Sequence, residues 1–141
     1  MVKVYWSWNM MSVLIEDFET GDFTANPWDN TVTPNYPWEI TTTNPYEGTY
    51  CMKSTGEGVA SVTSSIQITI EVPYNAVMSF YQMVSSEQNY DKGHFYIDGV
   101  EKATASGTSA WTYKEFDVTE GEHTYKWSYT KDSSVNSGSD T

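Results

Sequence analysis

The sequence is poor in cysteine and contains no long apolar run. Its single cysteine, Cys51, has no partner for an internal disulfide, so the chain must fold without that cross-link. No apolar run approaches the roughly 18 residues of a membrane helix, and we predict no membrane insertion. Residues 1–18 also lack the order of a secretion signal. Either a signal precedes this numbering, or the protein leaves its cell by another route, for example in a phage particle.

Positive charge is equally scarce. Seven basic residues stand against nineteen acidic ones, which gives a formal net charge of −12. This charge repels nucleic-acid phosphates and anionic lipids, so we predict no nucleic-acid partner. Two interpretations of the acidic excess remain open: it keeps the protein soluble, or some of the carboxylates bind a cation such as Ca²⁺.

Motifs for catalysis are also missing. The chain has two histidines and no metal-binding HExxH pair, no GxSxG or GxGxxG turn and no phosphate-binding loop. Carboxylates alone can supply a glycosidase pair, but nothing in the pattern indicates one, and we predict that the protein is not an enzyme. We expect His123 to be packed or hydrogen-bonded at the edge of an aromatic core, and His94 to be exposed.

The sequence is rich in aromatic residues and in alternating stretches. Six Trp, eleven Tyr and five Phe can fill a core or line a binding surface. Alternation predicts strands within residues 12–19, 38–43, 49–54, 64–72, 76–85, 93–104, 110–118 and 122–131, with a long loop over 20–37. Residues 64–72 place Ile66, Ile68, Ile70 and Val72 on one face, and residues 76–85 should be a central strand.

Turn signals connect these strands. Asp98-Gly99 and Glu120-Gly121 lie between alternating stretches, and we predict a hairpin at each. About nine short strands without helical periodicity predict an all-β protein, an antiparallel two-sheet β-sandwich. We see no internal repeat and no linker that divides it.

The order of several segments resembles a known family. The segments are "EDFETGDF", "PWEIT", "YEGTYCMKS", "MSFYQMVSSEQNYDKGHFYIDG", "WTYKEFDVTEGEHTYKWSYTKD" and "GSD". Together, over residues 12–141, they resemble the MAM-like jelly-roll modules called cleaved-adhesin or choice-of-anchor repeats, which occur in bacterial surface and secreted proteins. The resemblance implies a jelly roll that binds or adheres.

This resemblance also implies a structural Ca²⁺ where the first and last strands meet. The matching positions are Glu16, Asp17, Glu47 and Asp140, and clustered carboxylates suit a hard cation. In the family, "GSD" leads into one more strand that closes the sheet. We therefore expect the jelly roll, residues 12–141, to lack its usual C-terminal strand.

Residues 1–11 form an N-terminal extension that the family pattern does not require. Val4, Trp6 and Trp8 alternate with polar residues, so we predict a strand over residues 2–8 at the sandwich edge, next to residues 12–19 or 122–131, with Trp6 and Trp8 buried. This strand would cover an edge that otherwise exposes unpaired backbone groups. It would do so within one chain or, by self-association, in a neighbouring chain.

Two functions are consistent with this pattern. The first is an extracellular or cell-surface adhesion module that binds a glycan or a surface protein, with carbohydrate the favoured ligand. Its candidate ligand-binding rings are Trp28, Trp38, Tyr90 and Trp111, because aromatic faces stack on sugar rings. The alternative is a structural subunit of an extracellular filament or a virion, assembled by strand exchange.

Overall fold

The computed structural model describes residues 1–8, 11–133 and 141, and between residues 2 and 14 the one described side chain is that of Val4. The described residues form an all-β protein with antiparallel strands in two sheets. The predicted antiparallel β-sandwich is therefore confirmed, while its jelly-roll connectivity stays a prediction. No helix among the described residues is long and apolar enough to cross a membrane.

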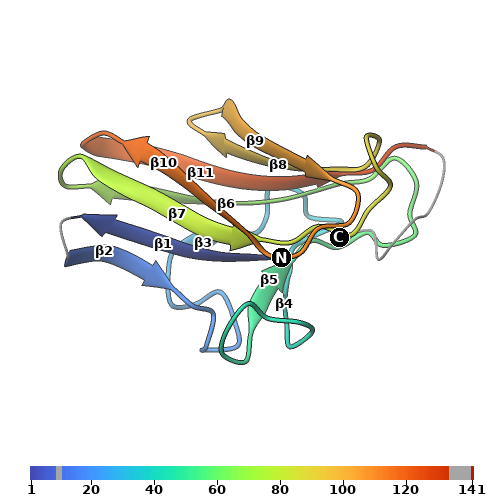
Figure 1. Ribbon diagram of the computed structural model, residues 1–141, viewed down its shortest axis with the longest axis horizontal. Helices are drawn as coiled ribbons and strands as arrows, with labels where there is room; N and C mark the ends of the chain where they lie inside the picture. The colour runs from blue at the N-terminus through green and yellow to red at the C-terminus, as the bar shows by residue number, and fades with distance from the viewer. Residues whose placement is uncertain (9–10, 134–140) are drawn as a thin grey trace.

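The first sheet has six strands in the order β10-β7-β1-β5-β4, with β2 paired beside β1 (Figure 1). Its members are β1 (Val2–Trp8), β2 (Met11–Glu16), β4 (Glu39–Thr41), β5 (Cys51–Lys53), β7 (Ala76–Gln82) and β10 (Thr112–Val118). The second sheet has the order β3-β6-β11-β8-β9. Its members are β3 (Trp28–Asp29), β6 (Thr63–Val72), β8 (Lys92–Ile97), β9 (Val100–Ser106) and β11 (Gly121–Thr130).

The core between the sheets is built largely from aromatic rings. Phe80 of β7 lies 4.7 Å from Phe95 and 5.5 Å from Trp127, measured between ring centroids, and all three side chains are buried. Edge-to-face geometry at both contacts is the arrangement that aromatic pairs favour. The two sheets therefore pack on each other through rings contributed by β7, β8 and β11.

Several strand predictions are confirmed. Ile66, Ile68 and Val72 of β6 are buried, and β7 is an interior strand between β10 and β1. Asp98 and Gly99 connect β8 to β9 with positive φ angles of 52° and 76°. These angles are what a two-residue hairpin connection requires.

The hairpin predicted at Glu120-Gly121 is wrong. The flanking strands β10 and β11 lie in different sheets, where β10 pairs with β7 and β11 pairs with β6 and β8. The turn residues do reverse the chain, but a reversal does not fix which strand becomes the neighbour. Here the chain crosses from one sheet to the other.

The strand predicted over residues 2–8 is present, but it is not at the sandwich edge. β1 pairs with β7 along one side and with β2 and β5 along the other, and Val4 is fully buried. The expected burial of Trp6 and Trp8 concerns side chains outside the described part. Because β1 has neighbours on both sides, it joins the two halves of the first sheet.

Both described ends of the chain lie beside the segment that follows β7 (Figure 1). Met1 and Met83 exchange hydrogen bonds of 3.0 and 3.2 Å, and Thr141 and Ser85 exchange bonds of 2.9 and 3.2 Å. The amine of Met1 is buried, and this desolvation lowers its pKa from 8.0 to about 6. Burial disfavours the charged form of a cationic group.

We predict that a chain with a free Met1 amine loses stability as the pH falls from 8 to 6. Throughout this range the amine binds more protons in the unfolded chain than in the folded chain, so the free energy of unfolding should decrease by about 2 kcal/mol. Urea unfolding at both pH values measures the effect. The control is the Nα-acetylated chain, which retains an N–H donor for the Met83 carbonyl but carries no charge. An equal pH dependence in the two chains would contradict the assignment.

Candidate functional site

An aromatic cluster lies on the outer face of the first sheet. It comprises Tyr46, Tyr81, Trp111 and Tyr113, and we call it the aromatic patch. Tyr81 of β7 and Tyr113 of β10 are direct cross-strand neighbours. Because Phe80 faces the core, strand alternation turns Tyr81 to the opposite face. Tyr46 comes from the loop between β4 and β5, and Trp111 lies immediately before β10.

The rings of the aromatic patch contact one another. Tyr46 stacks on Tyr81 with centroids 3.7 Å apart and an interplanar angle of 13°. Tyr113 lies 5.2 Å from Tyr81, and Trp111 meets Tyr46 edge-on at 5.8 Å. Tyr46 and Tyr113 remain 39% and 49% exposed, so large ring areas face solvent. These contacts fix the rings before any ligand arrives, which reduces the entropy cost of binding.

Hydrogen bonds hold the patch to its surroundings. The indole Nε1 of Trp111 donates to the Asn44 carbonyl at 3.2 Å, which ties the loop that carries Tyr46 to β10. The hydroxyl of Tyr113 donates to Oε2 of Glu115 at 3.0 Å. The pKa of Tyr46 is raised, chiefly by its hydrogen bond with Tyr81. The patch therefore combines exposed ring faces with hydroxyl and carboxylate groups.

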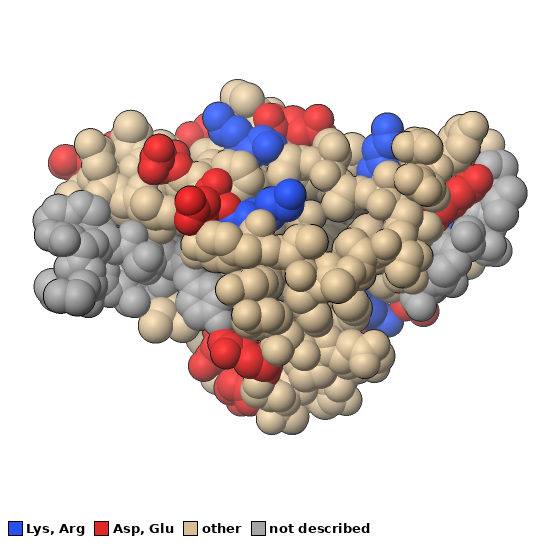
Figure 2. All heavy atoms as spheres, in the orientation of Figure 1, with Lys and Arg blue, Asp and Glu red and all other residues tan. Residues whose placement is uncertain are grey.

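The surface around the patch carries little charge. Figure 2 shows a broad uncharged area on this face, over the end of β7 and the loop between β4 and β5, with acidic side chains mainly toward the periphery. Exposed aromatic rings bordered by polar groups are typical of a binding surface. We therefore take the aromatic patch as the candidate ligand-binding site.

Of the four rings predicted to contact ligand, Trp111 alone belongs to the aromatic patch. Trp38 is 7% exposed and joins the core. Trp28 is half-buried, packs on Trp127 at 5.6 Å and donates from Nε1 to Glu16 at 2.8 Å. Tyr90 is 62% exposed and follows β7 in a separate loop. The sequence pointed to Trp111 but missed Tyr46, Tyr81 and Tyr113.

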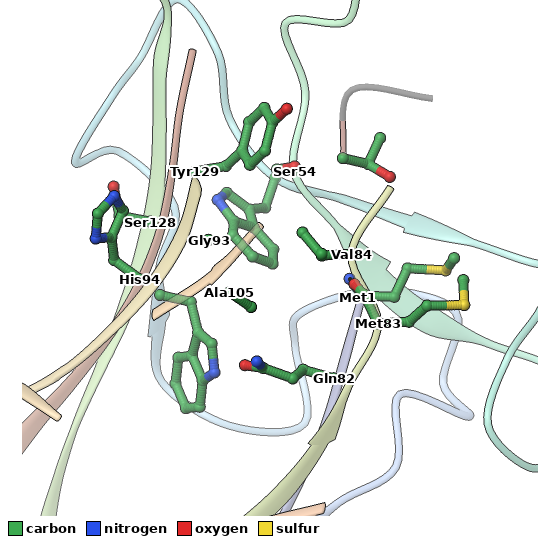
Figure 3. Close-up of a pocket in the computed structure, with 13 residues that line it drawn as sticks. Met1, Ser54, Gln82, Met83, Val84, Gly93, His94, Ala105, Ser128 and Tyr129 are labelled. Carbon is green, nitrogen blue, oxygen red and sulfur yellow. Dashed lines mark hydrogen bonds between the residues drawn. The ribbon is translucent and has the colours of Figure 1, made fainter. Parts of the chain in front are cut away.

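A small cavity lies near the chain ends, with Met1, Met83 and Val84 on one side and His94 and Ser128 on the other (Figure 3). Its volume is about 30 Å³, which is enough for ordered water but not for a sugar ring. The indole nitrogens of Trp38 and Trp127 have no hydrogen-bond partner among the described residues, and both side chains line this cavity. An ordered water molecule that accepts hydrogen bonds from these indole nitrogens would fit in this cavity.

The carboxylates predicted to share a calcium ion are not grouped in the described residues. Glu16 is buried, and its carboxylate accepts hydrogen bonds from Phe18 N, Asn26 Nδ2 and Trp28 Nε1 at 2.7–2.9 Å. These donors organise the loop after β2 and occupy the oxygens that a cation would need. Asp17 and Glu47 are exposed, and Asp140 lies outside the described residues.

A different acidic group does come together. One carboxylate oxygen from each of Glu87, Asp91 and Asp132 lies within 4.8 Å of the others. Asp91 is fully buried and binds the Lys131 ammonium at 3.0 Å, so Lys131 offsets one of the negative charges. Oε2 of Glu87 is buried without a hydrogen-bond partner among the described residues.

Both histidines are hydrogen-bonded. His123 Nδ1 lies 2.7 Å from Oδ2 of Asp98, which agrees with the expected role at the core edge. The expectation for His94 is wrong, because its side chain is 14% exposed. Its Nδ1 lies 2.6 Å from Glu101 and its Nε2 lies 2.9 Å from Thr130. These bonds connect β8 to its two neighbours, β9 and β11.

Comparisons with family models, with curated proteins and with solved structures found no match. The resemblance to MAM-like modules therefore stays a prediction from the sequence.

Proposed function

We propose that the chain is a non-catalytic adhesion module of a cell surface or extracellular structure, and that it binds carbohydrate through the aromatic patch. The observation that supports this proposal is the set of contacting rings on one sheet face, with Tyr46 and Tyr113 exposed to solvent and with Tyr81 and Trp111 packed against Tyr46. Apolar ring faces of this kind suit the C–H faces of pyranose rings. Nearby polar atoms, including the Glu115 carboxylate, can accept hydrogen bonds from sugar hydroxyls.

The negative charge of the protein disfavours one class of carbohydrate ligand. The net charge of −12 opposes the approach of anionic chains such as uronic-acid or sulfated polymers. In Figure 2 a few basic side chains border the uncharged area, mostly with acidic side chains nearby, and no large basic surface is seen on this face. We therefore expect neutral oligosaccharides to bind in preference to acidic ones.

Replacing a ring of the patch should weaken binding while leaving the fold intact. We predict that Trp111→Ala and Tyr113→Ala each reduce the affinity for immobilised neutral oligosaccharides at least tenfold, which corresponds to about 1.4 kcal/mol. Retention on a glycan array and a subsequent titration measure the loss, with far-UV circular dichroism as the check on folding.

The matched control is Tyr90→Ala, because Tyr90 is an exposed tyrosine outside the patch. This variant should bind as the unaltered chain does. Equal losses in Tyr90→Ala and Tyr113→Ala would contradict the location of the site. Absence of binding to any glycan on the array by the unaltered chain would contradict the carbohydrate ligand.

A structural Ca²⁺ is part of the same proposal. Glu87 and Asp91 lie in the loop between β7 and β8, and Asp132 follows β11, so a cation here would tie this loop to the second sheet. The orphaned Oε2 of Glu87 is what favours this position over Glu16, because Asp91, like Glu16, already accepts N–H donors at both oxygens, from Lys131 Nζ and Asp132 N. The ion would supply positive charge to carboxylates that otherwise repel one another, and their oxygens would coordinate it.

Chelation should then lower the melting temperature. An ion that binds only the folded state stabilises it by about 2.7 kcal/mol at one hundred times its dissociation constant. Calorimetry in calcium and in excess chelator measures the difference. We expect Glu87→Gln to remove this difference and Glu16→Gln to retain it, although the latter lowers stability in both buffers. Identical melting curves of the unaltered chain in the two buffers would exclude the ion.

A further inference from the structure

A cleft opens beside the aromatic patch, and we call it the polar cleft. Three chain segments contribute to its lining: Thr43 and Asn44 from the loop after β4, Met83 and Val84 after β7, and Thr108 and Ser109 before β10. Its volume of about 430 Å³ lies within the range of pockets that bind small molecules, about 300–1,000 Å³. The polar cleft is therefore large enough to hold part of a sugar unit.

The polar cleft directly adjoins the aromatic patch. Each of its three segments leads to a patch ring two residues away, and the pairs are Asn44 with Tyr46, Met83 with Tyr81, and Ser109 with Trp111. Two residues of fully extended chain span at most about 7 Å. The hydrogen bond of 3.2 Å from Trp111 Nε1 to the Asn44 carbonyl also joins the two sites. One oligosaccharide can therefore contact the patch with one unit and the polar cleft with the next.

The charged groups at the polar cleft are paired with one another. Lys53 and Glu57 both line it, and the Lys53 ammonium lies 2.6 Å from Oε1 of Glu57. The same ammonium lies 3.1 Å from Oε1 of Glu39. An anionic sugar therefore meets no unpaired cation among the described lining residues, and two carboxylates repel it. A neutral group suits this cleft better than an anionic one.

The polar cleft also combines apolar lining with open hydrogen-bonding groups. Met83 and Val84 supply the apolar part, and Val84 is 5% exposed. The hydroxyls of Thr43 and Thr108 make no hydrogen bond within the part of the chain that the structure describes, and both residues are exposed. Oε2 of Glu57 likewise meets no donor there, because the ion pair uses Oε1. Donors, an acceptor and an apolar surface are thus available to one ligand group.

We infer that the polar cleft binds an acetamido group, so that the ligand is a neutral oligosaccharide that contains N-acetylhexosamine. This inference rests on the proposed binding of carbohydrate by the aromatic patch. The methyl of the acetamido group packs against Met83 and Val84. Its carbonyl accepts from a threonine hydroxyl, and its N–H donates to Oε2 of Glu57. A sugar hydroxyl at the same position would leave the apolar lining without a contact.

Two trisaccharides test the inference, because they share ring stereochemistry and linkage and differ in this group alone. Chitotriose carries an acetamido group on each unit, whereas cellotriose carries a hydroxyl at the same position. Isothermal titration calorimetry of the unaltered chain measures both dissociation constants. We expect chitotriose to bind roughly tenfold more tightly or better, which is the discrimination that one small group in an apolar pocket provides.

The variant that probes the cleft carries Thr43→Val and Thr108→Val, which remove both hydroxyls and preserve the side-chain shape. We expect its preference for chitotriose to fall below about threefold, while its affinity for cellotriose stays within about twofold of that of the unaltered chain. The matched control is Thr104→Val, an exposed threonine of β9 outside the cleft. This control should keep the full preference.

Equal affinities of the unaltered chain for the two trisaccharides would overturn the inference, and so would a preference that the double variant retains. Neither result would bear on the patch, because Tyr113→Ala should weaken the binding of both trisaccharides in equal proportion. If neither trisaccharide binds, the inference is also overturned. Retention of another neutral glycan on the array would then leave the proposed function standing.

Discussion

Strand alternation along β7 is the constraint on which the rest of the structure depends. Phe80 must face inward because it meets Phe95 and Trp127 between the sheets, and Tyr81 must therefore face outward. A shift of one residue would expose Phe80 and bury the tyrosine hydroxyl, which is unfavourable on both counts. The aromatic patch is thus the outer counterpart of the aromatic core.

The neighbours of β7 hold that register. β10 brings Tyr113 beside Tyr81 on one side, and β1 pairs with residues 77–82 on the other. The indole of Trp111 and the stacking of Tyr46 then fix the loop between β4 and β5 over the same surface. Binding by the patch therefore depends on elements that are far apart in the sequence but adjacent in the first sheet.

Local patterns predicted most of the strands, because alternation and turn chemistry act over a few residues. Residues 64–72 and the Asp98-Gly99 turn belong to this class. Strand neighbours were harder to predict, as the wrong hairpin at Glu120-Gly121 shows, because sheet pairing depends on distant segments. Three rings of the patch were not predicted for the same reason: Tyr46, Tyr81 and Tyr113 are scattered along the sequence, and Trp111 is the one member of the patch among the four predicted ligand-binding rings. The resemblance implies a metal at Glu16, but its carboxylate accepts instead from Asn26 and Trp28, which lie 10 and 12 residues along the chain and are brought to it by the fold.

The most direct test of the central claim is an NMR titration of the chain with a neutral oligosaccharide that the glycan array retains. The account predicts that the ring signals of Tyr46, Tyr81, Trp111 and Tyr113 shift together with one dissociation constant, while those of Tyr90 and Trp28 stay unchanged. Shifts confined to the second sheet or to the loop that carries Tyr90 would contradict it.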